Sequence, residues 1–295
     1  MKTDQIQKVH KDWYKLDLSA IVYPTLQRRD FSSVYRLSVL LKEDIDPEIL
    51  QRAVNLTMPR FPTYKAAIRK GVFWRYLEPN DRPGPFVQED VKNPCQPMHF
   101  KGNNRYLVRI YYYRNRIALE AHHSLGDGTG GMCVLQTLTA TYLRLKGHSE
   151  IENGGFVLDI LGIPDPGELE DAYMKYANAK VCPPRPGEKT YRVRGTKEPF
   201  YTLNIIDGIM SVSEVMRVAK SYNATITEYL NSVLLYALMR KQESEWHLKL
   251  RPVKIAMPVN LRRFFPSRTL RNFITMIYPG IDPRLGEYTF EEIVT

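Results

Sequence analysis

Two adjacent histidines, an aspartate and several glycines form the stretch that most constrains how this chain can fold. Residues 122–128 read His-His-Ser-Leu-Gly-Asp-Gly. Before them, residues 116–121 alternate polar and apolar side chains, which is the period of a half-buried strand. After them, residues 132–145 carry apolar side chains at helical spacing. The pattern predicts a strand, a tight turn and a helix, with His123 at the carboxyl end of the strand, where ligands gather in α/β proteins.

The two histidines are expected to point to opposite faces of that strand. With a period of two, His123 shares a face with Leu119 and Ala121, whereas His122 shares the other face with Glu120. Neighbouring side chains of this kind cannot easily reach one ion, so no metal site is predicted. We expect a structural role for His122.

The chemistry of the stretch centres on His123. An imidazole with a near-neutral pKa can remove a proton from a hydroxyl or a thiol at physiological pH. Asp127 can make the turn rigid by binding backbone amides or an arginine, and Gly128 allows the backbone to approach a substrate closely. No serine or cysteine nucleophile elbow lies nearby, so direct transfer to an acceptor activated by His123 is favoured over a covalent intermediate.

A nucleotide-binding interpretation of the same residues is weaker. Residues 126–131 satisfy the G-x-G-x-x-G pattern of dinucleotide-binding turns. However, several strands precede this turn, and no repeated strand-helix-strand unit surrounds it. Redox chemistry with a nicotinamide cofactor is therefore the least favoured hypothesis.

Composition limits the class of protein. Hydrophobic residues make up 43% and charged residues 25% of the 295 residues, as in soluble globular proteins. The first residues carry no apolar stretch and no apolar run is long enough to span a membrane, so we expect neither a signal peptide nor a membrane span. The cysteines Cys95, Cys133 and Cys182 are scattered, which favours reduced thiols in the cytoplasm. The net charge of +10 is dispersed, so we expect a phosphate-bearing small molecule rather than nucleic acid as partner.

Composition also suggests the organisation of the chain. We predict an N-terminal subdomain at 1–160, a proline-rich crossover linker at 161–199 and a partial C-terminal subdomain at 200–295. Strands are expected at 34–41, 64–69, 72–77, 106–113, 117–122, 200–206, 253–259 and 272–278. Helices are expected from Pro47 to Pro59 and at 132–146, 168–178, 212–221 and 225–240, whereas residues 79–97 are expected to be a connection. Residues 288–295 look like the start of a helix that stops after barely two turns.

The motif resembles the H-H-x-x-x-D-G motif of the chloramphenicol acetyltransferase-like superfamily. That group includes alcohol O-acetyltransferases, plant acyl-CoA-dependent acyltransferases, polyketide-associated acyltransferases and the condensation domains of nonribosomal peptide synthetases. Residues 46–48 and 60–62 match the first half of that fold, and residues 258–262 and 271–273 resemble its second half. The resemblance is closest to the alcohol O-acetyltransferase branch. The D-F-G-W-G segment of many members is absent, so the C-terminal part of the fold is expected to be missing.

The resemblance implies an α/β fold, an α+β two-layer sandwich of two similar subdomains with the second incomplete. His123 would then be the general base that deprotonates an alcohol or amine acceptor, which attacks the thioester of an acyl-CoA cosubstrate. By the same analogy His122, Asp127 and Gly128 are structural at the active site, and no bound cofactor or metal is implied. The weaker candidates for channel contacts are Asn260 and Asn272.

A second hypothesis is a non-catalytic binding or scaffold protein built on a partial or degenerate acyltransferase fold. The abrupt end at Thr295 favours it, whereas the intact His123, Asp127 and Gly128 argue against it. Replacing His123 with alanine distinguishes the two, because only the catalytic protein needs this imidazole.

Overall fold

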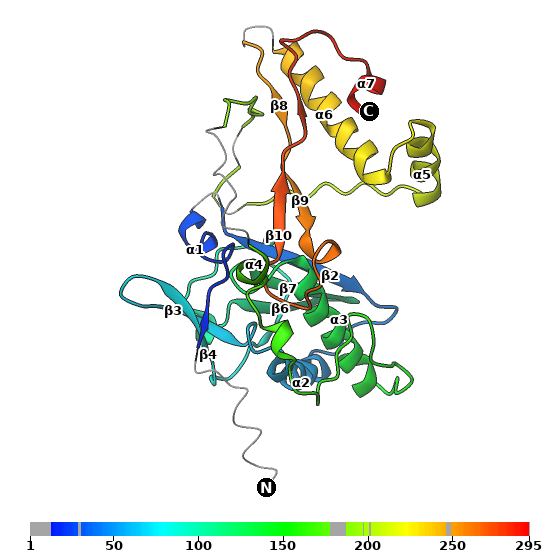
Figure 1. Ribbon diagram of the computed structural model, residues 1–295. Helices are drawn as coiled ribbons and strands as arrows, with labels where there is room; N and C mark the ends of the chain where they lie inside the picture. The colour runs from blue at the N-terminus through cyan, green and yellow to red at the C-terminus, as the bar shows by residue number, and fades with distance from the viewer. Residues whose placement is uncertain are drawn as a thin grey trace. The chain divides into compact units, whose positions relative to one another are not determined.

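The computed structural model describes residues 13–28, 31–177, 187–196, 198–200, 202–245 and 249–294. These residues pack into two units (Figure 1). The first unit comprises residues 1–177, 199–203 and 261–274, and the second comprises residues 178–198, 204–260 and 275–295. The first unit therefore continues past the boundary expected at residue 160 and takes in a short segment from late in the chain.

A four-stranded sheet is the centre of the first unit. Its strand order is β2-β7-β6-β5, with β2 at Val34–Leu40, β7 at Arg116–His122, β6 at Val108–Tyr113 and β5 at Val87–Glu89. The β2–β7 and β7–β6 pairs are antiparallel, whereas β5 runs parallel to β6. Because β7 is a central strand, its end is held on both sides by neighbouring strands.

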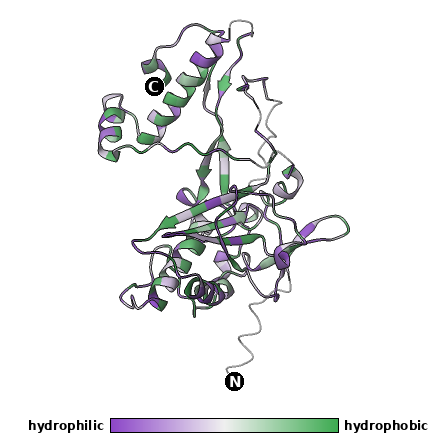
Figure 2. Ribbon diagram, turned by 180° about the vertical axis from the view of Figure 1, so that it is seen from behind, coloured by the Kyte–Doolittle hydropathy of each residue, from purple (hydrophilic) through white to green (hydrophobic). Residues whose placement is uncertain are grey.

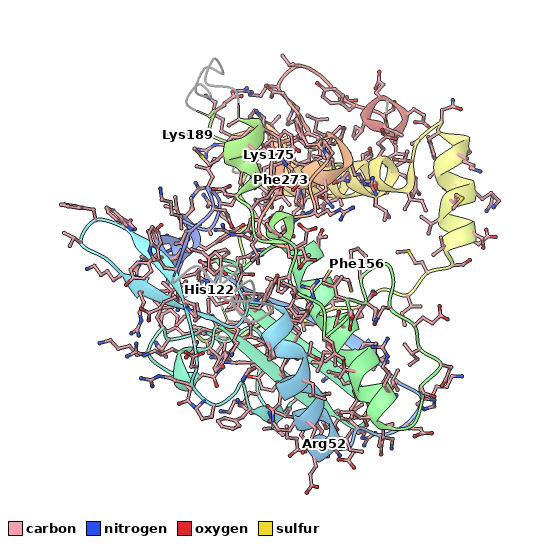
Figure 3. The ribbon with its side chains drawn as sticks, turned by 60° about the horizontal axis from the view of Figure 1, so that its bottom comes forward. Arg52, His122, Phe156, Lys175, Lys189 and Phe273 are labelled. Carbon is pink, nitrogen blue, oxygen red and sulfur yellow. The ribbon has the colours of Figure 1, made fainter. Side chains whose placement is uncertain are left out.

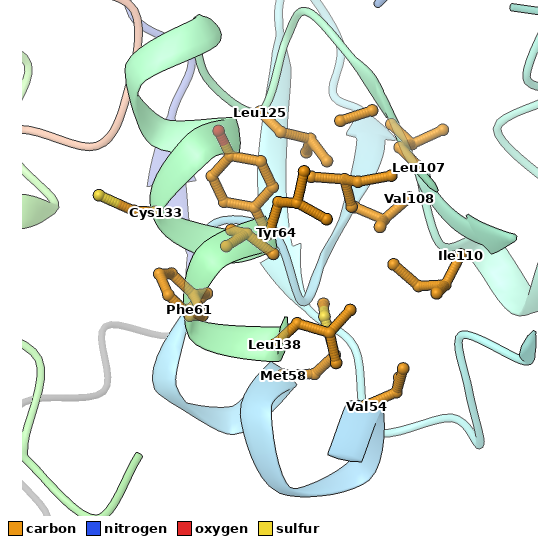
Figure 4. Close-up of a cluster of buried hydrophobic side chains, with 14 of the residues drawn as sticks. Val54, Met58, Phe61, Tyr64, Leu107, Val108, Ile110, Leu125, Cys133 and Leu138 are labelled. Atoms are coloured by element: carbon orange, nitrogen blue, oxygen red, sulfur yellow. The ribbon is translucent and has the colours of Figure 1, made fainter. Parts of the chain in front are cut away.

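Two helices, α2 at Pro47–Thr57 and α3 at Gly128–Leu145, pack against each other and against this sheet. Helix α2 begins as expected, because the Asp46 carboxylate accepts hydrogen bonds from the amides of Glu48 and Ile49 and a proline follows it. Figure 4 shows the apolar side chains between helices and sheet, including Val54, Tyr64, Ile110 and Leu138. This core fixes both the end of β7 and the start of α3.

Shorter elements complete the first unit. A three-stranded sheet has the order β1-β4-β3, with β1 at Tyr14–Lys15, β4 at Arg75–Pro79 and β3 at Ala66–Lys70. The short helices are α1 at Tyr23–Leu26 and α4 at Ala172–Tyr176, and 3₁₀ turns occur at Met58–Arg60, Asn103–Arg105, Pro166–Glu168 and Leu261–Arg263.

The second unit has a smaller core around Leu235, Met239 and Val253. Its helices are α5 at Val212–Ser221, α6 at Ile226–Ser244 and α7 at Phe290–Val294. Thr225 and Glu228 form a reciprocal capping box at the start of α6. Four short strands form two pairs. Strand β8 at Val253–Lys254 pairs antiparallel with β11 at Gly280–Ile281, and β9 at Met257–Asn260 pairs with β10 at Ile274–Ile277.

Several expectations for individual elements are wrong. Strand β7 is buried on both faces rather than one, because α3 covers one face and the 95–100 segment, with Phe100 against His122, lies at the other. Helix α3 begins at Gly128 instead of residue 132, because the Asp127 side chain caps it there. The described part of residues 200–206 forms no strand, and Cys182 lies outside the described residues. The expected strand at 253–259 is two short strands, and the expected connection at 79–97 contains β5.

Candidate functional site

His123 directly follows β7 and is held there by the backbone. Its amide donates to the carbonyl oxygen of Ser33 at 2.9 Å, which continues the β2–β7 ladder one residue beyond the strand. The preceding amide, that of His122, donates to Leu107 at 3.0 Å on the other side. The main chain at the histidine pair is therefore anchored to both neighbouring segments.

Two tyrosine rings enclose the imidazole of His123. The Tyr23 ring stacks on it with a centroid distance of 4.6 Å and an interplanar angle of 18°, and the Tyr35 ring lies 4.7 Å away at 52°. The Tyr35 hydroxyl donates to the backbone oxygen of Asp127 at 3.2 Å and lies 3.2 Å from the Tyr64 hydroxyl. Burial raises the pKa of Tyr23 to about 12, and it also raises the pKa values of Tyr35 and Tyr64. All three hydroxyls therefore keep their protons at neutral pH.

The environment of His123 favours the neutral imidazole. The side chain is half-buried, and its Nδ1 is buried without a hydrogen-bond partner. Burial lowers the pKa of His123, and this effect exceeds the opposite influence of the Asp127 charge and of Asn272. A neutral imidazole at neutral pH can accept a proton.

Asp127 is fully engaged in structural hydrogen bonds. Its Oδ1 accepts from the amides of Thr129 and Gly130 at 3.0 and 3.3 Å, which caps α3. Its Oδ2 accepts from Arg262 Nη1 at 2.8 Å and from the Phe273 amide at 2.9 Å. The carboxylate is 2% exposed, so it ties the turn to the 262–273 segment and does not face a substrate.

A second buried group, around Asn272 and Asp17, holds the main chain of His123. Asn272 donates from Nδ2 to the backbone oxygen of His123 at 2.9 Å and to Asp17 Oδ2 at 3.1 Å. Asp17 also accepts from the Ala20 amide and lies 3.6 Å from Arg271 Nε. Burial raises the pKa of Asp17, and the Arg271 charge acts against that change. These contacts tie the segment around Asp17 to the segment around Asn272 and to the main chain of His123.

His122, labelled in Figure 3, is fully buried in the first unit. Its Nδ1 accepts from the Ser124 amide at 3.2 Å, and its ring lies edge-on to Phe100. Burial, with a smaller contribution from His123, lowers the pKa of His122 to about 4. This histidine is therefore neutral at physiological pH and has no access to solvent.

The glycines around the turn differ in their surroundings. A Cβ on Gly131 would lie 2.5 Å from the Tyr35 hydroxyl, and Cβ atoms on Gly126 and Gly130 would clash with Tyr64 and with the Leu270 carbonyl. A Cβ on Gly128 would meet nothing within 4 Å. Packing therefore explains the other three glycines but not Gly128, which is exposed at the first position of α3.

The two asparagines that the sequence suggested as channel contacts belong to different units. Asn272 lies at His123, whereas Asn260 is the last residue of β9 and belongs to the second unit. Among the described residues, no group of three or more possible metal ligands comes together. Ser124, next to His123, is buried with its hydroxyl bonded to Ala20, and burial raises the pKa of Cys133 to about 11. Neither of these two side chains is an activated nucleophile.

Sequence reasoning did not assign roles to several residues of the site: Asp17, Tyr23, Tyr35, Arg262 and Arg271. A buried aspartate requires a charged or donor partner, so Asp127 itself predicts that an arginine will approach. Nothing in the local pattern identifies which arginine does so, because Arg262 lies 135 residues away in the chain.

No protein-family model matches the sequence, and neither does any curated protein. Solved structures do match. Polyketide synthase associated protein 5 from Mycobacterium tuberculosis has a TM-score of 0.61 at 15% identity, over 95% of this chain and 70% of that one. The first condensation domain of the calcium-dependent antibiotic synthetase has a TM-score of 0.59 at 16% identity, over 96% of this chain and 72% of that one. The starter condensation domain of rhizomide synthetase, in complex with C8-CoA, has a TM-score of 0.59 at 13% identity, over 95% of this chain and 68% of that one.

The chain has the condensation-domain fold. This confirms the α/β, chloramphenicol acetyltransferase-like architecture expected from the motif. None of the helices in the described ranges is long and apolar enough to cross a bilayer.

Proposed function

We propose that this protein is an acyltransferase that moves an acetyl or longer acyl group from coenzyme A to an alcohol or amine, with His123 as general base. The observation that carries the proposal is the state of His123: neutral, half-buried and held between two tyrosine rings at the end of β7. The condensation-domain fold and its solved relative with C8-CoA support an acyl-CoA donor.

The reaction step uses one proton acceptor. Nδ1 of His123 is enclosed, so the acceptor's hydroxyl or amine proton moves to Nε2. The acceptor oxygen or nitrogen forms a bond to the thioester carbonyl carbon, and the carbon–sulfur bond then breaks. The imidazolium returns its proton to the leaving thiolate, so that coenzyme A leaves as a free thiol and His123 is neutral again.

The other residues hold this base in place. Asp127 keeps the turn and the 262–273 segment together, and His122 fills the interior behind the strand end. Gly128 leaves open space at the start of α3 for a substrate. We assign Asn272 to positioning and keep Asn260 as a weaker contact of the substrate channel. The acceptor we favour is an alcohol, from the motif's resemblance to alcohol O-acetyltransferases.

The test is acceptor-dependent thiol release. Acetyl-CoA and octanoyl-CoA are each incubated with the protein and a panel of alcohols and amines, and free thiol and acylated product are measured. We expect release that requires an acceptor and is lost in His123→Ala, with an unchanged circular dichroism spectrum. No release by the folded wild-type protein with any pair would favour the non-catalytic binding or scaffold function instead.

A further inference from the structure

The tip of the β3–β4 hairpin exposes three large apolar side chains in a row. Val72, Phe73 and Trp74 are 84%, 87% and 60% exposed, respectively. The loop is closed by the Gly71 amide, which donates to the Trp74 carbonyl at 2.7 Å, so the tip is a defined turn. Figures 1 and 2 show the hairpin extending from the first unit with an apolar end. An ordered apolar tip of this kind marks an interaction surface.

The tip does not contribute to the core. Lower in the hairpin, Ile68 and Leu77 are buried opposite each other and anchor it to the first unit. The Phe73 and Trp74 rings contact each other at 6.4 Å beyond that anchor. Replacing the tip residues should therefore leave the fold intact.

An open pocket continues the apolar surface beside the tip. It is lined by hairpin residues 70–75 together with Lys15, Leu16, Ile21 and Thr25. Ile21 is itself more than half exposed. The apolar surface thus reaches from the hairpin to the segment that precedes α1.

Cations surround this apolar surface. Lys15, Lys70 and Arg75 line the pocket, and none of its lining residues within the described ranges is acidic. Lys70 and Arg75 lie directly opposite each other in the last strand pair before the loop, an unfavourable cross-strand pair of like charges. The Phe100 ring, 5.3 Å from the Arg75 guanidinium, offsets part of that repulsion. Glu78, further along β4, is paired with Arg69 at 2.5 Å. The pocket and tip therefore carry a positive charge.

We propose that the β3–β4 hairpin docks this protein on an anionic lipid bilayer, with Phe73 and Trp74 in the interface and the three cations at the headgroups. Trp and Phe are favourable at the boundary between headgroups and acyl chains. Lys and Arg next to them are attracted by the negative surface potential of anionic lipids. The tip is short, so the protein lies on the surface as a peripheral protein.

Co-sedimentation of the full chain with vesicles tests the proposal. Vesicles of phosphatidylcholine alone are compared with vesicles that contain about 30% phosphatidylserine, at about 0.1 M salt. We expect the wild type to bind the anionic vesicles. The variant Phe73→Ser/Trp74→Ser should bind them with an affinity that is lower by roughly tenfold or more. The affinity of the variant Lys70→Gln/Arg75→Gln for the anionic vesicles should be roughly 30-fold lower than that of the wild type. The control is Ile206→Ser/Ile209→Ser, whose replaced side chains are 97% and 98% exposed elsewhere, and it should bind as wild type does.

Tryptophan fluorescence supplies an independent readout. Trp74 should move to a less polar environment on binding, so anionic vesicles should shift the emission of the wild type to shorter wavelength. Trp74→Phe keeps the apolar side chain, and it should keep the binding but lose most of the shift. Equal binding to neutral vesicles, or tip variants that bind as the wild type does, would overturn the proposal. So would absence of binding to the anionic vesicles.

Discussion

The side-chain nitrogen of Asn272 lies 2.9 Å from the backbone oxygen of His123, although 149 residues separate them in sequence. The same nitrogen also donates to the buried carboxylate of Asp17. Through this bond to the main chain of His123, Asn272 fixes where the end of β7 lies.

Replacing Asn272 tests this arrangement. In Asn272→Ala, Asp17 loses one of its donors, and we expect a loss of about 1–3 kcal/mol in the free energy of unfolding. Asn272→Asp places a second carboxylate beside Asp17 and should cost more than the alanine variant, because two buried like charges repel. Urea unfolding measures both. An aspartate variant as stable as wild type would contradict the contact.

The pair Asp127–Arg262 predicts coupled stability. Removing either charge leaves the other buried, so Asp127→Asn and Arg262→Gln should each destabilise the protein by about 3–5 kcal/mol. In the double variant neither charge remains unpaired, so the two losses should be less than additive, with a coupling energy of about 1–3 kcal/mol. A double-mutant cycle in urea measures this coupling, and strict additivity would show that the two side chains act independently.

Gly128 and Gly131 should respond differently to the same substitution. Gly131→Ala forces a Cβ against the Tyr35 hydroxyl and should cost about 1–3 kcal/mol of stability. Gly128→Ala enters open space and should stay within about 1 kcal/mol of the wild type.

The activity of the two glycine variants separates packing from substrate access. If the open space at Gly128 receives a substrate, then Gly128→Ala raises KM or lowers kcat in acyl transfer without a change in melting temperature. Full activity in Gly128→Ala would show that no substrate comes close to this position.

The buried His122 predicts a loss of stability in acid. The pKa of His122 is about 4 in the folded protein and 6.5 when unfolded, so between these values only the unfolded chain binds the proton. The contribution of neutral His122 to the free energy of unfolding is therefore complete above pH 6.5. It is lost as the pH falls to 4, by ~3 kcal/mol in total. To measure this loss, the free energy of unfolding is determined for wild type and for His122→Gln at a series of pH values, and the difference between them is plotted against pH.

A flat difference between wild type and His122→Gln over the same interval would contradict the burial of His122.

Local pattern predicted much of the first unit. The alternation before His122 and the helical spacing after residue 132 identified β7 and α3, and Asp46 followed by Pro47 identified the start of α2. The start of α3 was placed too late, since a run of glycines disfavours a helix unless a cap such as Asp127 stabilises its first turn. Strand β5 was missed because three residues among prolines carry no detectable periodicity.

The surroundings of His123 depend on contacts that no local pattern contains. Tyr23 lies in an N-terminal stretch whose apolar residues have no regular spacing, and Asp17 contacts Asn272 across 255 residues of sequence. A buried carboxylate, a stacked ring and an amide donor are common features of any core, so their residue types alone do not mark a site. Only the fold brings these segments together.

The most direct test of the account is the kcat/KM of acyl transfer for His123→Ala, measured with the donor and acceptor found in the thiol-release screen. His148→Ala serves as the matched control, because it removes an exposed imidazole from the same unit. We predict a loss of about 100- to 10,000-fold for His123→Ala, the usual contribution of a general base, and no change for the control. Acyl transfer by folded His123→Ala at the wild-type rate would contradict the assignment of His123 as the base.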